Sequence, residues 1–222
     1  MKISISVLNI DFKNLRQTIE VLESAGIDSW HMDIMDGHFV DNISFGPDVV
    51  KTVNEISDLP IFTHLMIKNP EKHIDKYFEA GSEIVTVHAE VLNDDNIDIL
   101  EKENIGISFN PDYPLPEIFP YLEKVKEVLV MSVFAGFGGQ EFIEDSLARI
   151  SQLDERKKEL GLDFKISVDG GINAKNALSC LNAGANEVII GTFVTKSQDP
   201  AEKIKEIQEN IKSLDDRSKK FS

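Results

Sequence analysis

The sequence predicts a single-domain α/β fold, a (β/α)8 barrel over residues 1–214, followed by a polar tail at 215–222. Two observations support this prediction. Short apolar runs rich in β-branched residues alternate eight times with longer amphipathic stretches, and a length of 222 residues suits one barrel. A doubly wound open sheet would bury the same strands, but eight evenly spaced units close more simply into a barrel.

The predicted strands are the apolar runs at 3–8, 29–34, 61–66, 84–87, 105–109, 128–133, 165–168 and 187–190. Helical periodicity marks residues 14–25, 48–56, 70–80, 94–101, 115–122, 142–160, 174–183 and 200–211. In the first of these, Leu15, Ile19 and Leu22 are spaced for one face. Glycine follows several predicted helices, as Gly26 does the first, and is the usual C-terminal stop.

Charge and composition exclude several classes of function. The net charge is −16, from 23 basic and 39 acidic residues, which disfavours binding to nucleic acid or to an anionic membrane. No run approaches the about 18 apolar residues of a membrane span, and the N-terminus does not read as a signal peptide. The single cysteine, Cys180, can form neither an intrachain disulfide nor a cysteine-based metal site. We therefore expect a cytoplasmic protein.

Histidines and carboxylates gather at the predicted strand ends, where barrels of this kind carry their active sites. His31, Asp33 and Met35 share one face of the second strand, since side chains alternate along it. His64 lies near the end of the third strand, and Asp169 follows the seventh. Such a ligand set suits one divalent ion and does not choose among Zn²⁺, Mn²⁺, Fe²⁺ and Co²⁺. The alternative is a buried hydrogen-bonded His–Asp pair.

Glycine-rich turns follow the sixth, seventh and eighth strands. They contain Gly136, Gly138, Gly139, Gly170, Gly171 and Gly191, with Thr192 next to the last. Glycine lets backbone N–H groups approach an oxyanion closely, and barrels often bind phosphate after strands seven and eight. Each turn alone could be an ordinary turn, but three at strand ends favour a phosphate site.

Three methionines lie at or near predicted strand ends: Met35, Met66 and Met131. They could line the site as a flexible apolar surface that excludes water, or they could simply pack the barrel. His88 and Glu90, at the end of the fourth strand, could support the site from behind its ligands.

These segments resemble the ribulose-phosphate 3-epimerase family over nearly the whole chain. The most specific match is the H-x-D-x-M-D-G-H-F-V run at residues 31–40. Other matches follow in the family's order, at 6–9, 44–47, 64–66, 87–90, 110–111, 136–140 and 169–173. The chain departs from the family pattern at Ile5 and Asp41, where proline is usual, and at Phe134-Ala135-Gly136, where Asn-Pro-Gly or similar is usual.

The resemblance implies a TIM barrel that interconverts D-ribulose 5-phosphate and D-xylulose 5-phosphate, commonly as a homodimer or larger homo-oligomer. It implies that His31, Asp33, His64 and Asp169 bind the metal and that the two aspartates double as the acid/base pair. It further implies that Ser6 contacts the substrate and that the glycines Gly138, Gly139, Gly170, Gly171 and Gly191, with Thr192, surround the phosphate.

The expected chemistry is proton removal from C3, next to the C2 ketone, to give an enediolate. A divalent ion would stabilise the developing charge, and a second acid would return a proton to the opposite face. Three alternatives remain at this point: a C3 epimerase of a related ketose phosphate such as D-allulose 6-phosphate, a metal-free phosphate-binding barrel enzyme, and a catalytically silent sugar-phosphate sensor.

Overall fold

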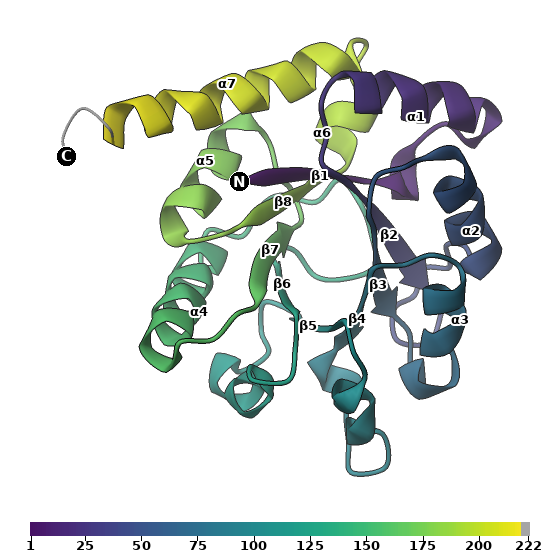
Figure 1. The fold of residues 1–222 in the computed structure, drawn as a ribbon, viewed down its shortest axis with the longest axis vertical. Helices are drawn as coiled ribbons and strands as arrows, with labels where there is room; N and C mark the ends of the chain where they lie inside the picture. The colour runs from purple at the N-terminus through teal and green to yellow at the C-terminus, as the bar shows by residue number, and fades with distance from the viewer. Residues whose placement is uncertain (219–222) are drawn as a thin grey trace.

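The computed structural model describes residues 1–218, with side chains for residues 1–212. Its centre is a closed barrel of eight parallel strands in chain order, surrounded by helices (Figure 1). Closure is completed where β1 (Lys2–Ser6) pairs with β8 (Glu187–Ile190). The predicted (β/α)8 barrel, formed as a single domain, is therefore confirmed.

The remaining strands are β2 (Ser29–Met35), β3 (Ile61–Met66), β4 (Ile84–His88), β5 (Ile105–Phe109), β6 (Glu127–Met131) and β7 (Lys165–Asp169). The α-helices are α1 (Leu15–Ser24), α2 (Pro47–Ile56), α3 (Ile74–Glu79), α4 (Ser146–Leu160), α5 (Ala174–Ala183), α6 (Thr192–Thr195) and α7 (Pro200–Ser218). The 3-10 turns are η1 (Val7–Asn9), η2 (Phe12–Asn14), η3 (Pro70–Lys72), η4 (Ala89–Val91), η5 (Ile97–Glu101) and η6 (Leu115–Tyr121).

Side chains alternate along each strand between two buried regions, the inside of the barrel and the layer between the strands and the helices. On β2, Trp30 and Met32 are buried in the apolar layer between the strands and the helices. His31 and Asp33, at the intervening positions, are buried inside the barrel. The strand register places Asp33 beside His64 of β3 and Met35 beside Met66. Neighbouring strands thus bring polar side chains to one level and methionines to the level above.

The N-terminal end of the barrel interior holds a buried ionic network. Lys165 Nζ lies 3.0 Å from Glu127 Oε1 and also pairs with Glu187. Hydroxyl groups complete the network, since Ser167 Oγ and Thr86 Oγ1 each donate to Glu127 at 2.6 Å. Burial alone raises the pKa of Glu127, but Lys165 and these hydroxyls outweigh it and lower the pKa to about 2.

The structure differs from the prediction after β4 and β5. The α-helices predicted at 94–101 and 115–122 are wrong: these segments hold the 3-10 turns η5 and η6. In η6, Pro120 lies inside the segment, and a proline there cannot donate the hydrogen bond that an α-helix requires. The helix predicted at 70–80 is divided at His73 into η3 and α3.

The last helix is longer than predicted. α7 extends to Ser218, so the first four residues of the expected tail at 215–222 are helical, and residues 219–222 lie outside the described residues. Within the part of the chain that the structure describes, no helix is both long and apolar enough to span a membrane.

Candidate active site

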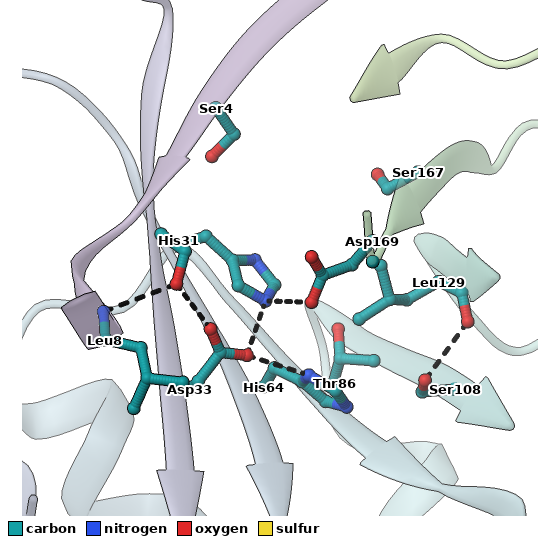
Figure 2. Close-up of polar contacts among 12 residues, drawn as sticks. Ser4, Leu8, His31, Asp33, His64, Thr86, Ser108, Leu129, Ser167 and Asp169 are labelled. Carbon is teal, nitrogen blue, oxygen red and sulfur yellow. Dashed lines mark hydrogen bonds and ion pairs between the residues drawn. The ribbon is translucent and has the colours of Figure 1, made fainter. Parts of the chain in front are cut away.

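Two histidines and two aspartates from three strands meet at the C-terminal end of the barrel (Figure 2). Asp33 Oδ1 lies 3.2 Å from both His31 Nε2 and His64 Nδ1. Asp169 Oδ2 approaches from β7, 4.0 Å from His31 Nε2. One ligand atom from each of the four residues lies within 4.8 Å of the other three. Barrel closure thus brings together the whole predicted ligand set.

Charge and burial shift the four pKa values in different directions. Burial alone lowers the pKa of His31, but Asp33 and Asp169 outweigh it and raise the pKa to about 9. Burial lowers the pKa of His64 to about 4. Burial and the charge of Asp33 raise the pKa of Asp169 to about 7. Asp33 goes the other way: burial opposes ionisation, but His31 and His64 hold its pKa below the ordinary value.

These residues fit a divalent cation. His31 Nε2 is buried and has no hydrogen-bond partner, although it points at two carboxylates. Two carboxylates this close repel each other when both are ionised, and this repulsion adds to the effect of burial in raising the pKa of Asp169. A cation among the four ligand atoms would satisfy the unpartnered nitrogen and offset the repulsion. Nitrogen and carboxylate donors together suit Zn²⁺, Mn²⁺, Fe²⁺ or Co²⁺.

A pocket opens directly above this cluster. Including its open mouth it holds about 540 Å³ free of protein atoms, enough for a small ligand. Its lining contains Asp33, Asp169 and every residue predicted to bind substrate: Ser6, Met35, Met66, Met131, Gly136, Gly138, Gly139, Gly170, Gly171, Gly191 and Thr192. His31 and His64 are not part of the lining and are buried.

Close packing requires glycine at several positions of the pocket, although not at Gly139 or Gly191, where a Cβ would lie 3.7 Å or more from its neighbours. A Cβ on Gly171 would lie 2.6 Å from the backbone nitrogen of Phe142, and φ there is +63°. A Cβ on Gly138 would lie 2.4 Å from Asn9 Nδ2. The loops after β6 and β7 and the turn η1 therefore approach one another closely at glycine. These loops present glycine backbone in part of the pocket wall.

The three methionines line the pocket in two patches. Met35 and Met66 pack together with Val40, whereas Met131 packs with a different cluster near Ile189. Ala135 touches both clusters. An alanine from the loop after β6 therefore joins the two patches.

Several lining residues were not predicted as site residues from the sequence. Asn9, Gln140, Phe137 and Phe134 belong to this group. Gln140 Nε2 donates to the carbonyl oxygens of Phe134 and Phe137 and so shapes the loop, while the Phe134 ring is half-exposed at the rim. The sequence did carry signals for them: Phe134 departs from the family pattern, and the other three lie in segments that match it.

Known proteins resemble the chain along nearly its full length. A profile of the ribulose-phosphate 3 epimerase family matches residues 2–195. The chain is 37% identical over 213 residues to ribulose-phosphate 3-epimerase of Bacillus subtilis, covering 94% of this chain and 98% of the relative. This chain belongs to the ribulose-phosphate 3-epimerase family. As a member of the family it is an epimerase, an enzyme of the isomerase class.

Two further relatives of this epimerase come from Arabidopsis thaliana and Methanocaldococcus jannaschii. Chloroplastic ribulose-5-phosphate-3-epimerase of Arabidopsis thaliana is 39% identical over 212 residues, covering 93% of this chain and 75% of the relative. Ribulose-phosphate 3-epimerase of Methanocaldococcus jannaschii is 37% identical over 213 residues, covering 94% and 90%.

Solved structures of other barrel enzymes share the fold of this epimerase. The 3-hexulose-6-phosphate synthase of Salmonella typhimurium superposes with a TM-score of 0.71 at 18% identity, covering 96% of this chain and 99% of that one. Orotidine 5'-phosphate decarboxylase of Pyrococcus horikoshii gives 0.70 at 19% identity, covering 95% and 99%. At such low identity the likeness supports the fold alone.

Proposed function

We propose that this enzyme inverts C3 of D-ribulose 5-phosphate to give D-xylulose 5-phosphate. One observation carries the proposal: two carboxylates and two histidines converge beneath a pocket that glycine-rich loops line on one side. The names of the relatives agree with it. A cytoplasmic location and a homo-oligomeric state stay predictions.

In this proposal His31, Asp33, His64 and Asp169 hold one divalent cation. When bound, the cation supplies Lewis-acid stabilisation of negative charge that develops on the sugar oxygens. The unpartnered His31 Nε2 supports this assignment. The choice among zinc, manganese, iron and cobalt is left to experiment, because all four accept this donor set.

The two aspartates are assigned the proton transfers. One takes the C3 proton from one face of the sugar, and the other delivers a proton to the opposite face. Inversion needs two groups, because a single base that returned its own proton would restore the original centre. The environments of Asp33 and Asp169 push their pKa values apart, as expected for an acid and a base that work together. The reverse reaction exchanges their roles.

Ser6 is assigned a double role in this scheme. Its hydroxyl donates to Asp33 Oδ2 at 2.6 Å and accepts the N–H of Leu8 at 3.3 Å. The same side chain lines the pocket. It would orient one proton-transferring carboxylate and contact the substrate beside it.

The remainder of the pocket is assigned to binding. The glycine backbone after β6, β7 and β8, with the hydroxyl of Thr192, would bind the phosphate. Met35, Met66 and Met131 would cover the reacting carbons and exclude water from the enediolate. This division puts the charged end of the substrate against backbone donors and its reacting end above the aspartates.

The test is incubation with D-ribulose 5-phosphate in heavy water with the metal-replete protein. Deuterium at C3 of D-xylulose 5-phosphate is expected. Asp33→Asn and Asp169→Asn should each slow epimerisation by about 10²-fold or more. The exposed Asp163→Asn, at the other end of the barrel, is the matched control and should keep wild-type turnover.

Two results would contradict the assignment. Near-normal turnover in either active-site variant would show that the reaction does not need both carboxylates. Faster turnover of D-allulose 6-phosphate than of D-ribulose 5-phosphate would keep the reaction type but reject the proposed substrate.

A further inference from the structure

A line of polar contacts leads away from His64 on the side opposite Asp33. His64 Nε2 lies 2.8 Å from His88 Nε2, and His88 Nδ1 lies 3.0 Å from Glu90 Oε2. Both imidazole rings are fully buried and stack at 4.9 Å between centroids. The ring of Phe39 covers His88 at 4.6 Å. Burial and these contacts restrict the movement of both rings.

The hydrogen-bonding roles along this line follow from its outer end. An ionised Glu90 only accepts, so a neutral His88 carries its proton on Nδ1 and leaves Nε2 as an acceptor. The facing His64 Nε2 must then be the donor. His64 Nδ1, which points at Asp33 Oδ1, is left with its lone pair free to bind a cation.

Glu90 also reaches the loop that forms the pocket rim. Its Oε1 accepts the backbone N–H of Asn110 at 2.7 Å. Asn110 Oδ1 in turn accepts the backbone N–H of Ala135 at 2.8 Å. Ala135 belongs to loop six, the segment 132–145 between β6 and α4. The Glu90 carboxylate is therefore linked to the cation site through His88 and to loop six through Asn110.

We propose that Glu90 is a positioning residue that serves both halves of the site: through His88 it holds His64 in the tautomer that binds the cation, and through Asn110 it anchors loop six over the substrate. This inference rests on the cation site and substrate of the proposed function. It extends that function, because it assigns a role to residues that touch neither the cation nor the sugar.

A Glu90→Gln substitution removes the negative charge of the side chain and keeps its shape. A carboxylate accepts from His88 and from Asn110 at once, whereas the amide has one oxygen and one donating nitrogen. If the amide nitrogen faces His88, the proton of His88 moves to Nε2 and opposes the proton of His64. His64 must then carry its proton on Nδ1, where it blocks the cation. If the amide nitrogen faces Asn110 instead, the anchor of loop six is lost.

The cation arm of the test uses affinity, independent of turnover. Where the amide nitrogen of Glu90→Gln faces His88, titration of the metal-free protein with Co²⁺, followed by its absorption bands, should show about 10- to 100-fold weaker binding than in wild type. Where the amide nitrogen faces Asn110, KM should rise instead. The exposed Glu83→Gln is the matched control with unchanged affinity. Nitrogen-15 NMR of the zinc-loaded wild type should show the His64 proton on Nε2.

A second pair of variants tests the His64 tautomer if Glu90→Gln does not fold. His88→Gln retains an acceptor for the His64 Nε2 proton, whereas His88→Leu removes it. The leucine variant should bind Co²⁺ more weakly than the glutamine variant. Equal affinities in this pair would overturn the tautomer role.

The loop arm uses Asn110→Ala, which removes the acceptor of the Ala135 N–H and keeps the backbone N–H that Glu90 binds. It should raise KM for the phosphoketose while Co²⁺ affinity stays at the wild-type value. Asn110→Asp keeps an acceptor oxygen and should stay closer to the wild-type KM. Equal KM values in wild type and Asn110→Ala would overturn the role in loop six.

The outcomes separate this inference from the function it rests on. If wild type binds no Co²⁺, or if loss of His64 leaves binding unchanged, the proposed cation site itself is wrong. If wild type binds Co²⁺ through His64 and a folded Glu90→Gln matches wild type within about twofold in both Co²⁺ affinity and KM, only the role of Glu90 is wrong.

Discussion

Replacing Asp169 by asparagine is predicted to stabilise the cation-free protein at alkaline pH while abolishing activity. In the cation-free fold, burial and the charge of Asp33 raise the pKa of Asp169 from 3.8 to about 7. The folded state therefore binds more protons than the unfolded chain between about pH 4 and pH 7. The stability that this proton contributes is present at low pH and is lost as the pH rises through that range.

The size of the effect follows from the pKa change. Because one pKa unit corresponds to about 1.4 kcal/mol, the full effect is about 4 kcal/mol, of which about 3 kcal/mol falls between pH 5 and pH 8. These are upper values, since the Asp169 side chain keeps 16% of its surface exposed and its surroundings can relax. Asparagine carries no charge to desolvate, so the variant lacks this pH dependence.

The assay is urea unfolding of wild type and Asp169→Asn in the presence of a chelator, at several pH values from 5 to 8. The free energy of unfolding of the variant minus that of wild type should increase by up to about 3 kcal/mol across the range. Asp163→Asn, an exposed change, should show no such trend. A difference that stays constant with pH would refute the reasoning, because it would mean that the fold does not resist ionisation of Asp169.

Three further predictions concern the pocket wall, the ionic network and the cation. Gly171→Ala should raise KM by about tenfold, since its Cβ would lie 2.6 Å from the Phe142 nitrogen. Gly161→Ala is the control, because Gly161 has a similar φ of +65° but open space around it. That variant should lose about 1–2 kcal/mol of stability and keep the wild-type KM. A KM that rises equally in both variants would contradict the role of Gly171 in the wall of the substrate pocket. The folded state lowers the pKa of Glu127 from 4.5 to about 2, so its stabilisation of about 3 kcal/mol is present above pH 4.5 and is lost as the pH falls toward 2. The unfolding free energies of wild type and Glu127→Gln should therefore converge at acid pH. A difference between them that does not change with pH would argue against the ionic network. Chelation should abolish turnover and re-addition of Zn²⁺, Mn²⁺, Fe²⁺ or Co²⁺ should restore it, as measured by metal content and epimerisation rate; full activity in metal-free protein would reject the cation.

Much of the fold could be predicted because its signals are local. A short apolar run rich in β-branched residues marks a strand, and glycine after alanine marks a helix end, as at Gly184. The segments 94–101 and 115–122 have helical spacing but form 3-10 turns. Their conformation depends on proline placement and on packing against the barrel, which periodicity alone does not report.

The candidate cation ligands were predictable from their chemistry and strand positions, but their meeting was not. His31 and Asp33 share a strand, so their closeness follows from local geometry. Asp169 lies more than a hundred residues away along the chain, and only barrel closure brings it within reach of them. The link from Glu90 through Asn110 to Ala135 likewise joins three separate segments. The sequence by itself determined which side chains each strand presents, because alternation is a property of the local backbone. The tertiary structure alone decided which of them touch, because distances between remote segments are set by strand register and closure of the barrel.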